Sequence, residues 1–179
     1  AILRDLPSAP AELSAENDLE RAFYNPALLD APFPGWADVI AALVLLDQAI
    51  SVVLEAGRDS TYAPLAGRVG KMLQEERFHR IFGEGWLARL AADEQLRPRL
   101  LTALERFGAA AITWLGPDDD PAAQTLIESG ILAGGPAQWR ADWLARVTPA
   151  LQKHGLSIPV APATWAGWNG QRRQVGDGK

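Results

Sequence analysis

The stretch from Trp36 to Glu55 is apolar around nearly its whole circumference when it is wound as an α-helix. A helix on the surface of a protein keeps one polar face, so this pattern predicts an interior helix that other elements cover on several sides. Gly57 follows shortly and is a typical C-terminal stop. The rest of the fold is therefore expected to be built around residues 36–55.

Asp47 interrupts this apolar stretch. It shares a helix face with Leu43, Ile50 and Leu54, at a place where leucine would be the ordinary residue. Three roles are open to its carboxylate: it can accept hydrogen bonds from a neighbouring helix, bind a cation, or hold a proton with a raised pKa. Hydrogen bonding is what most buried polar groups do, and it is the interpretation that requires no ligand.

A second pattern lies in the segment KMLQEERFHRIFGEGW, residues 71–86. Glu76 and His79 are three positions apart, so on a helix both side chains lie on one face, one turn from each other. A carboxylate and an imidazole at this spacing can bind the same ion, and Glu-x-x-His is half of the ligand set of di-iron helix bundles. The alternative is a helix surface with charged neighbours, because a four-residue pattern is common by chance. Apolar residues recur around the pair and turn this face toward a core: Met72, Phe82, Gly83 and Trp86.

Helical periodicity also predicts the remaining elements. The helix with Glu76 and His79 is expected to start near Tyr62 or Pro64 and to end at Gly83 or later, where Gly83 and Gly85 loosen it. A third long helix is expected over residues 96–115, a shorter one over 121–132, and a last one over 136–155. The expected buried faces are Leu100, Leu104, Phe107, Ala111 and Trp114 in the third helix, and Trp139, Trp143, Val147 and Leu151 in the last.

The two ends of the chain lack this periodicity. We expect a single domain with an irregular N-terminal segment over 1–35, which holds a short helix from Ser14 to Phe23, a helical bundle over 36–155, and an extended or disordered arm over 156–179. Arg172 and Arg173 in the arm are expected to be solvated. His154 is expected to cap the last helix. The run 118–120, three aspartates, is expected to be a solvated turn and helix cap rather than a cation site.

Composition excludes several classes of protein. The chain has 179 residues and 48% hydrophobic content, enough for one domain with a sizeable core. It has no cysteine, which excludes disulfides, a thiolate nucleophile and Cys-based zinc or iron–sulfur sites. A net charge of −5 without a basic stripe argues against nucleic-acid binding. The longest apolar run, Val39 to Leu46, is too short to cross a bilayer, and no signal peptide precedes it, so we expect a cytoplasmic protein that does not enter the membrane.

Three stretches together resemble a known family. ERAFYNPALLDAPFPGWADVIAALVLLDQA, KMLQEERFHRIFGEGWLARL and HGLSIPVAPATWAGWNGQRRQ are similar to the PaaA/PaaC proteins of the bacterial phenylacetyl-CoA ring 1,2-epoxidase, over about Glu20 to Arg173. The resemblance implies a ferritin-like helix bundle. In that family the A-type subunit carries a di-iron centre that activates oxygen and is supplied by a reductase, and the C-type subunit pairs with it as a scaffold. The arm favours the C-type subunit.

The resemblance also implies roles for the residues singled out above. Asp47 matches the family's lone helix carboxylate, and Glu76 with His79 matches its second Glu-x-x-His. Relative to the family, the chain is expected to lack the first helices, with the other carboxylate and the first Glu-x-x-His, and the last helix. The expected metal site is half of a di-iron site or its vestige, in which Asp47, Glu76 and His79 could bind one ferrous ion with water completing the set.

Two hypotheses follow from different classes of protein. The preferred one is a structural subunit of a multicomponent phenylacetyl-CoA ring 1,2-epoxidase in phenylacetate catabolism, with no cofactor of its own, which docks the catalytic A-type subunit and other subunits in a hetero-oligomer. The alternative is a metal-bearing di-iron oxygenase subunit that itself activates oxygen. A ferritin-like protein with an unrelated role is a third hypothesis, because architecture does not determine chemistry.

Overall fold

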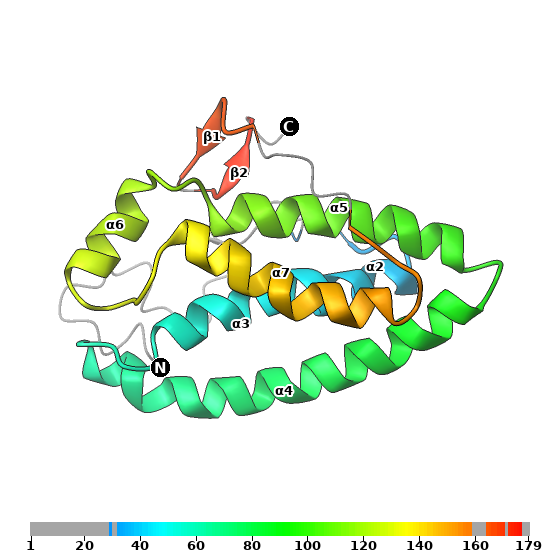
Figure 1. The fold of residues 1–179 in the computed structure, drawn as a ribbon, viewed down its shortest axis with the longest axis horizontal. Coiled ribbons are helices and arrows are strands. Elements are labelled where there is room, and N and C mark those ends of the chain that lie inside the picture. The colour runs from blue at the N-terminus through cyan, green and yellow to red at the C-terminus, as the bar shows by residue number, and fades with distance from the viewer. Residues whose placement is uncertain (1–28, 30–31, 159–163, 171, 177–179) are drawn as a thin grey trace.

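The computed structural model describes residues 29, 32–158, 164–170 and 172–176, and Figure 1 shows their arrangement. The helix predicted between Ser14 and Phe23 lies outside the described residues, as does most of the segment 1–35. The elements are α2 (Trp36–Ala41), η3 (Ala42–Leu46), α3 (Asp47–Ala56), α4 (Ala63–Ala92), α5 (Arg97–Leu115), α6 (Pro121–Glu128), α7 (Pro136–Gln152), β1 (Trp168–Asn169) and β2 (Gln174–Val175). Helices form the body of the described part, which confirms the predicted all-α bundle.

The first three elements form one continuous helix at the centre of the bundle. It packs against α4 on one side and against α5 and α7 on the others. Ile40, Leu45 and Ala49 are fully buried in it, which confirms the predicted interior helix. The helix from Trp36 to Ala56 has 21 residues, and its most apolar 18-residue stretch has a mean hydropathy of 2.0. By length and composition it is sufficient to cross a membrane, which the shorter run from Val39 to Leu46 did not suggest. Half of that stretch is buried within this fold.

The central helix widens into a π-helix over η3, directly before Asp47. The Asp47 backbone N–H donates to the Ala42 carbonyl, five residues back rather than four. Trp143 of α7 donates its indole N–H to the Leu45 carbonyl, with 2.9 Å between Nε1 and O. Single π-helical turns inside α-helices are rare, and many of those known lie at functional sites. The wider turn changes the direction in which Asp47 projects.

Helix α4 is the longest element and runs along one edge of the bundle (Figure 1). It begins after Tyr62, with Pro64 in its first turn, as predicted. The prediction that Gly83 and Gly85 loosen it was wrong, because the helix continues to Ala92. Gly83 is buried where α4 meets η3, and a Cβ there would lie 3.1 Å from Val44 Cγ1. The glycine therefore permits close helix packing.

The predicted core faces of α5 and α7 are confirmed. In α5 Leu100, Leu104, Phe107 and Ala111 are buried, and Trp114 packs partly buried against the same core. The four predicted residues of α7, Trp139, Trp143, Val147 and Leu151, are also buried. Gly116 ends α5 with a φ of 86°, a conformation that glycine adopts without strain.

Three expectations about the C-terminal part differ from the structure. Arg173 is not solvated: the antiparallel hairpin of β1 and β2 places its guanidinium against the end of α5, where it contacts Asp120. Asp120 caps α6, as predicted, but it is buried rather than solvated. At the end of α7, Arg97 donates to the carbonyls of His154 and Gly155, a task that the sequence suggested for the His154 imidazole. Arginine reaches these carbonyls because α5 begins beside the end of α7.

Candidate metal centre

The structure brings Asp47, Glu76 and His79 together from two helices. Asp47 is the first residue of α3, and Glu76 and His79 lie one turn apart on the face of α4 that packs on it. One ligand atom from each residue lies within 4.8 Å of the others. The convergence that the sequence suggested is therefore present, and metal binding by these residues stays a prediction.

The imidazole lies between the two carboxylates. His79 Nδ1 is 3.6 Å from Asp47 Oδ2 and 3.5 Å from Glu76 Oε2. The carboxylate side chains are 19% and 18% exposed, whereas that of His79 is 51% exposed. The cluster is thus closed on the side of the bundle and open on the side of α4 that no described element covers.

The protein surroundings leave Asp47 incompletely satisfied. Its Oδ2 atom is buried and has no hydrogen-bond partner among the described residues. Burial, followed by the neighbouring Glu76 carboxylate, raises the pKa of Asp47 to about 7, while His79 acts in the opposite direction. Two carboxylates held together in a poorly hydrated place favour either a shared proton or a cation between them.

Ser51 is a member of this cluster that the sequence analysis missed. It lies one turn after Asp47 and is 2% exposed. Its hydroxyl lies 3.1 Å from the Asp47 carbonyl and 3.5 Å from Glu76 Oε2. The i, i+4 spacing from Asp47 places Ser51 on the same helix face, and this feature of the sequence could have identified it.

The donor set fits one divalent transition-metal ion. Two carboxylate oxygens and an imidazole nitrogen suit ferrous iron, and Asp47 Oδ2, which accepts no hydrogen bond from the described residues, has an electron pair available. A two-iron site of the bundle type needs a second Glu-x-x-His and another carboxylate. The chain has two histidines, and His154 is preceded at the required position by Leu151. These residues therefore fit half of such a site.

The raised pKa of Asp47 predicts how the metal-free protein responds to pH. The folded chain keeps the Asp47 proton up to about pH 7, whereas the unfolded chain loses it near its ordinary value of 3.8. The contribution of Asp47 to the free energy of unfolding is therefore fully present below about pH 4 and is lost as the pH rises through about 7. Between pH 5 and 8 we expect the free energy of unfolding of the wild type to fall by about 2 kcal/mol more than that of Asp47→Asn.

Urea denaturation at several pH values, with a chelator present, measures this difference. Glu75→Gln is the matched control, because it removes an exposed carboxylate from the same helix that carries Glu76. Parallel pH profiles for the wild type and Asp47→Asn would show that Asp47 titrates normally.

In this bundle, two packed helices bring two carboxylates and one histidine together. This arrangement is typical of one class of protein, the ferritin-like helix bundles. Residues 6–176 match the model of the family described as phenylacetic acid catabolic protein. The chain belongs to this family, which confirms the resemblance seen in the sequence.

Two relatives from Escherichia coli (strain K12) show where in the family the similarity lies. The C subunit of 1,2-phenylacetyl-CoA epoxidase is 30% identical over 172 residues, which cover 89% of this chain and 67% of the relative. The A subunit of the same enzyme is 26% identical over 136 residues, which cover 74% of this chain and 44% of the relative. The similarity to the C subunit is thus higher and extends over more of the chain.

Proposed function

We infer that this chain is a structural subunit of a multicomponent phenylacetyl-CoA ring 1,2-epoxidase, in which it docks a di-iron catalytic subunit of the A type in the cytoplasm. The supporting observation is the similarity to the C subunit of the epoxidase, which exceeds the similarity to its A subunit in both identity and coverage. The half set of metal ligands agrees with this role, because a di-iron site needs twice as many. The bundle would then act by positioning its partner.

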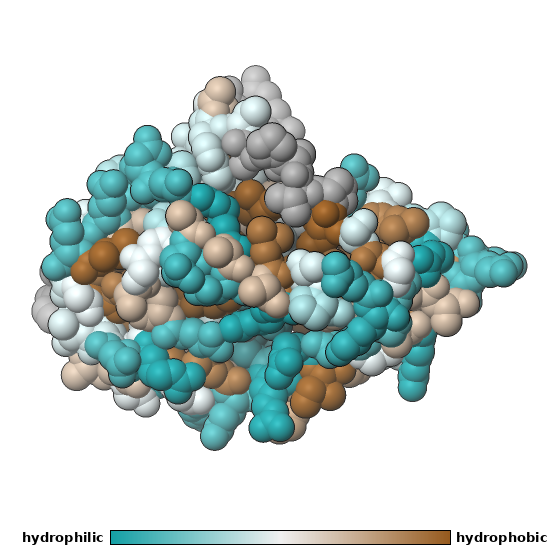
Figure 2. All heavy atoms as spheres, viewed as in Figure 1, coloured by the Kyte–Doolittle hydropathy of each residue, from teal (hydrophilic) through white to brown (hydrophobic). Residues whose placement is uncertain are grey.

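The surface of α4 offers a place for a protein partner. Four large apolar side chains stand in solvent along α4 and the start of α2: Trp36 is 45% exposed, Phe78 71%, Ile81 56% and Phe82 48%. The rings of Trp36 and Phe82 are in contact, with centroids 6.3 Å apart. We call these four residues the aromatic face. Figure 2 shows hydrophobic side chains reaching the surface among polar ones along the edge where α4 lies.

The aromatic face corrects one expectation from the sequence. The sequence predicts Phe82 on the core side of α4, but its side chain lies on the exposed side. Exposed apolar patches of this kind mark contact surfaces, since water contact with such area is unfavourable. Aromatic residues in particular are enriched at the centres of protein interfaces.

Reconstitution with the cognate A-type subunit tests the structural role. We expect the two chains to elute together from size-exclusion chromatography and Phe78→Asp with Ile81→Asp to abolish the complex, because two buried charges in an apolar interface are strongly unfavourable. Leu101→Asp is the matched control, since Leu101 is 43% exposed on α5 and outside the aromatic face. Separate elution of the wild-type chains would contradict the role.

A metal-bearing oxygenase subunit is the second candidate, and it is favoured by the buried Oδ2 of Asp47, which accepts no hydrogen bond from the described residues. Asp47, Glu76 and His79 would hold the ion, and bound iron would supply the redox chemistry that activates oxygen. The residues themselves would orient the ion against α3 and lose the Asp47 proton when it binds.

Two measurements separate the candidates. The structural role predicts that the chain with a reductase, but without the A-type subunit, forms no epoxide from phenylacetyl-CoA. It also predicts substoichiometric iron by elemental analysis after incubation with ferrous iron and desalting. Product formation and one iron per chain, both lost in Glu76→Ala, would establish the oxygenase instead.

A further inference from the structure

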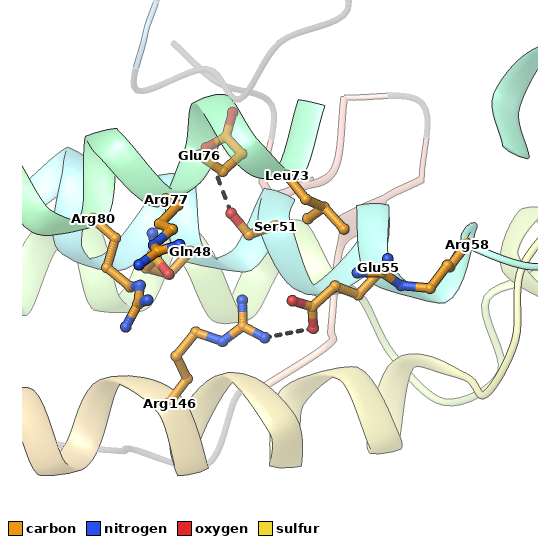
Figure 3. A pocket seen from close by; sticks show the side chains of 9 residues that line it. All are labelled: Gln48, Ser51, Glu55, Arg58, Leu73, Glu76, Arg77, Arg80 and Arg146. Carbon is orange, nitrogen blue, oxygen red and sulfur yellow. Dashed lines mark hydrogen bonds and ion pairs between the residues drawn. The ribbon is translucent and has the colours of Figure 1, made fainter. Parts of the chain in front are cut away.

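A cavity between α3, α4 and α7 is lined by arginines and adjoins the candidate metal centre through Glu76, which belongs to both. It has a volume of about 370 Å³, within the range of small-molecule sites. Figure 3 shows Arg77 and Arg80 projecting from α4 toward it and Arg146 reaching it from α7. We call it the arginine pocket. Its described lining contains four arginines, with Arg58 as the fourth, and two glutamates, in a chain whose net charge is −5.

The two glutamates do not neutralise the pocket. Glu55 is paired with Arg146, with 2.6 Å between Oε2 and Nη2. Glu76 faces His79 and Ser51 in the candidate metal centre. Two positive charges therefore remain in excess on the walls when both acids are ionised.

The remaining arginines are weakly engaged. Arg80 lies 3.9 Å from Glu84, both partly exposed, which is a weak surface pair. Within the described part of the chain, the side chains of Arg58 and Arg77 make no hydrogen bond or ion pair. Guanidinium groups held on one concave surface repel one another unless an anion lies between them. Their donor atoms are available to such an anion.

Gln48 gives an independent indication that the pocket binds a ligand. Gln48 lines the cavity and is only 3% exposed, and its side-chain nitrogen, Nε2, is buried without a hydrogen-bond partner among the described residues. A buried amide N–H without an acceptor costs free energy, so native structures seldom keep one. An oxygen atom placed in the pocket would accept from it. The Gln48 Nε2 group and the guanidinium groups all donate hydrogen bonds, which matches a ligand that accepts them.

We propose that the arginine pocket binds a phosphate group. A phosphate offers several acceptor oxygens and a negative charge, and the planar guanidinium donates to phosphate oxygens in pairs. The volume leaves room for a phosphate monoester as well as for inorganic phosphate. Arg77, Arg80 and Arg146 would neutralise the charge of the phosphate, and the buried Gln48 side chain would donate a hydrogen bond to it. This site does not depend on the proposed scaffold role.

Isothermal titration of the 179-residue chain with inorganic phosphate, against chloride at equal ionic strength, tests the site. We expect saturable binding of phosphate and none of chloride. Arg77→Gln combined with Arg80→Gln is expected to weaken phosphate binding by at least about ten-fold, because two charge-assisted donors are lost. Arg77→Lys keeps the positive charge but loses the planar guanidinium that donates to two oxygens at once, so it should weaken phosphate binding less.

Arg99→Gln with Arg89→Gln is the matched control, because it removes the same charge from exposed positions outside the pocket. Equal weakening by this control, or no saturable phosphate binding by a folded wild-type chain, overturns the site. Titration with coenzyme A as a second ligand distinguishes a site for a phosphate ester from a site for free phosphate. If the arginine variants weaken coenzyme A binding as they weaken phosphate binding, the pocket takes a phosphate ester. If phosphate alone responds, it takes the free anion.

Discussion

Replacing Trp143 by alanine is expected to lower the free energy of unfolding by about 4 kcal/mol, the largest effect of any single substitution proposed for this chain. The Trp143 side chain is fully buried among α3, α5 and α7, so its removal leaves a cavity that the surrounding helices can fill only in part. It also removes the indole N–H that satisfies the Leu45 carbonyl in the π-helical segment. Thermal and urea denaturation followed by circular dichroism measure the loss.

Trp143→Phe separates the two contributions to that loss. Phenylalanine keeps much of the buried apolar area but leaves the Leu45 carbonyl without its donor. We expect this variant to lose about 1–3 kcal/mol, of which about 1 kcal/mol comes from the lost indole hydrogen bond. A loss below about 1 kcal/mol for Trp143→Ala would mean that the core around α7 is not packed as the structure shows.

Replacing Arg173 by alanine is expected to cost about 3 kcal/mol, although the residue lies near the C-terminal end of the chain. Its guanidinium lies 2.9 Å from Asp120, whose side chain is 1% exposed. It also donates to the carbonyls of Trp114 and Leu115, which end α5 without an intrahelical partner. The substitution would leave a buried negative charge and two carbonyls uncompensated.

A double-mutant cycle isolates the ion pair from the other contacts. Asp120→Asn keeps an oxygen that can accept from the Ala122 N–H at the start of α6 but removes the charge. In this background Arg173→Ala is expected to cost about 1–2 kcal/mol less than in the wild type. Additive effects of the two substitutions would show that the carboxylate and the guanidinium do not interact in solution.

Hydrophobic periodicity predicted the parts of the fold that repeat along one helix. The stretch 36–55, the start of α4 at Pro64 and the buried faces of α5 and α7 all follow from residues three or four positions apart. The convergence of Asp47 with Glu76 and His79 was also suggested, by a lone acid on an apolar face and by the spacing of the other two. Local patterns therefore gave most of the helices and the main members of the candidate site.

The features that the sequence did not predict depend on contacts between distant segments. The π-helical turn before Asp47 has no signature in ALVLL, and Trp143 supports it from another helix. The pairing of Arg173 with Asp120 joins a hairpin to the start of α6, and neither position has a periodic pattern. The exposure of Phe82 depends on which elements cover α4. None of these is determined by neighbours in the sequence.

The absence of a side chain at Gly83 sets how near the two helices of the candidate metal centre can come to each other. A methyl group there would lie 3.1 Å from Val44 and 3.3 Å from Leu43, so one helix would have to yield by a few tenths of an ångström. Gly83 is one turn beyond His79 on α4, and Val44 lies one turn before Asp47 on the opposing helix. Gly83, which has no side chain, thus limits the distance between the helices that carry Asp47 and His79. A single ion bound by both residues would have to span that distance.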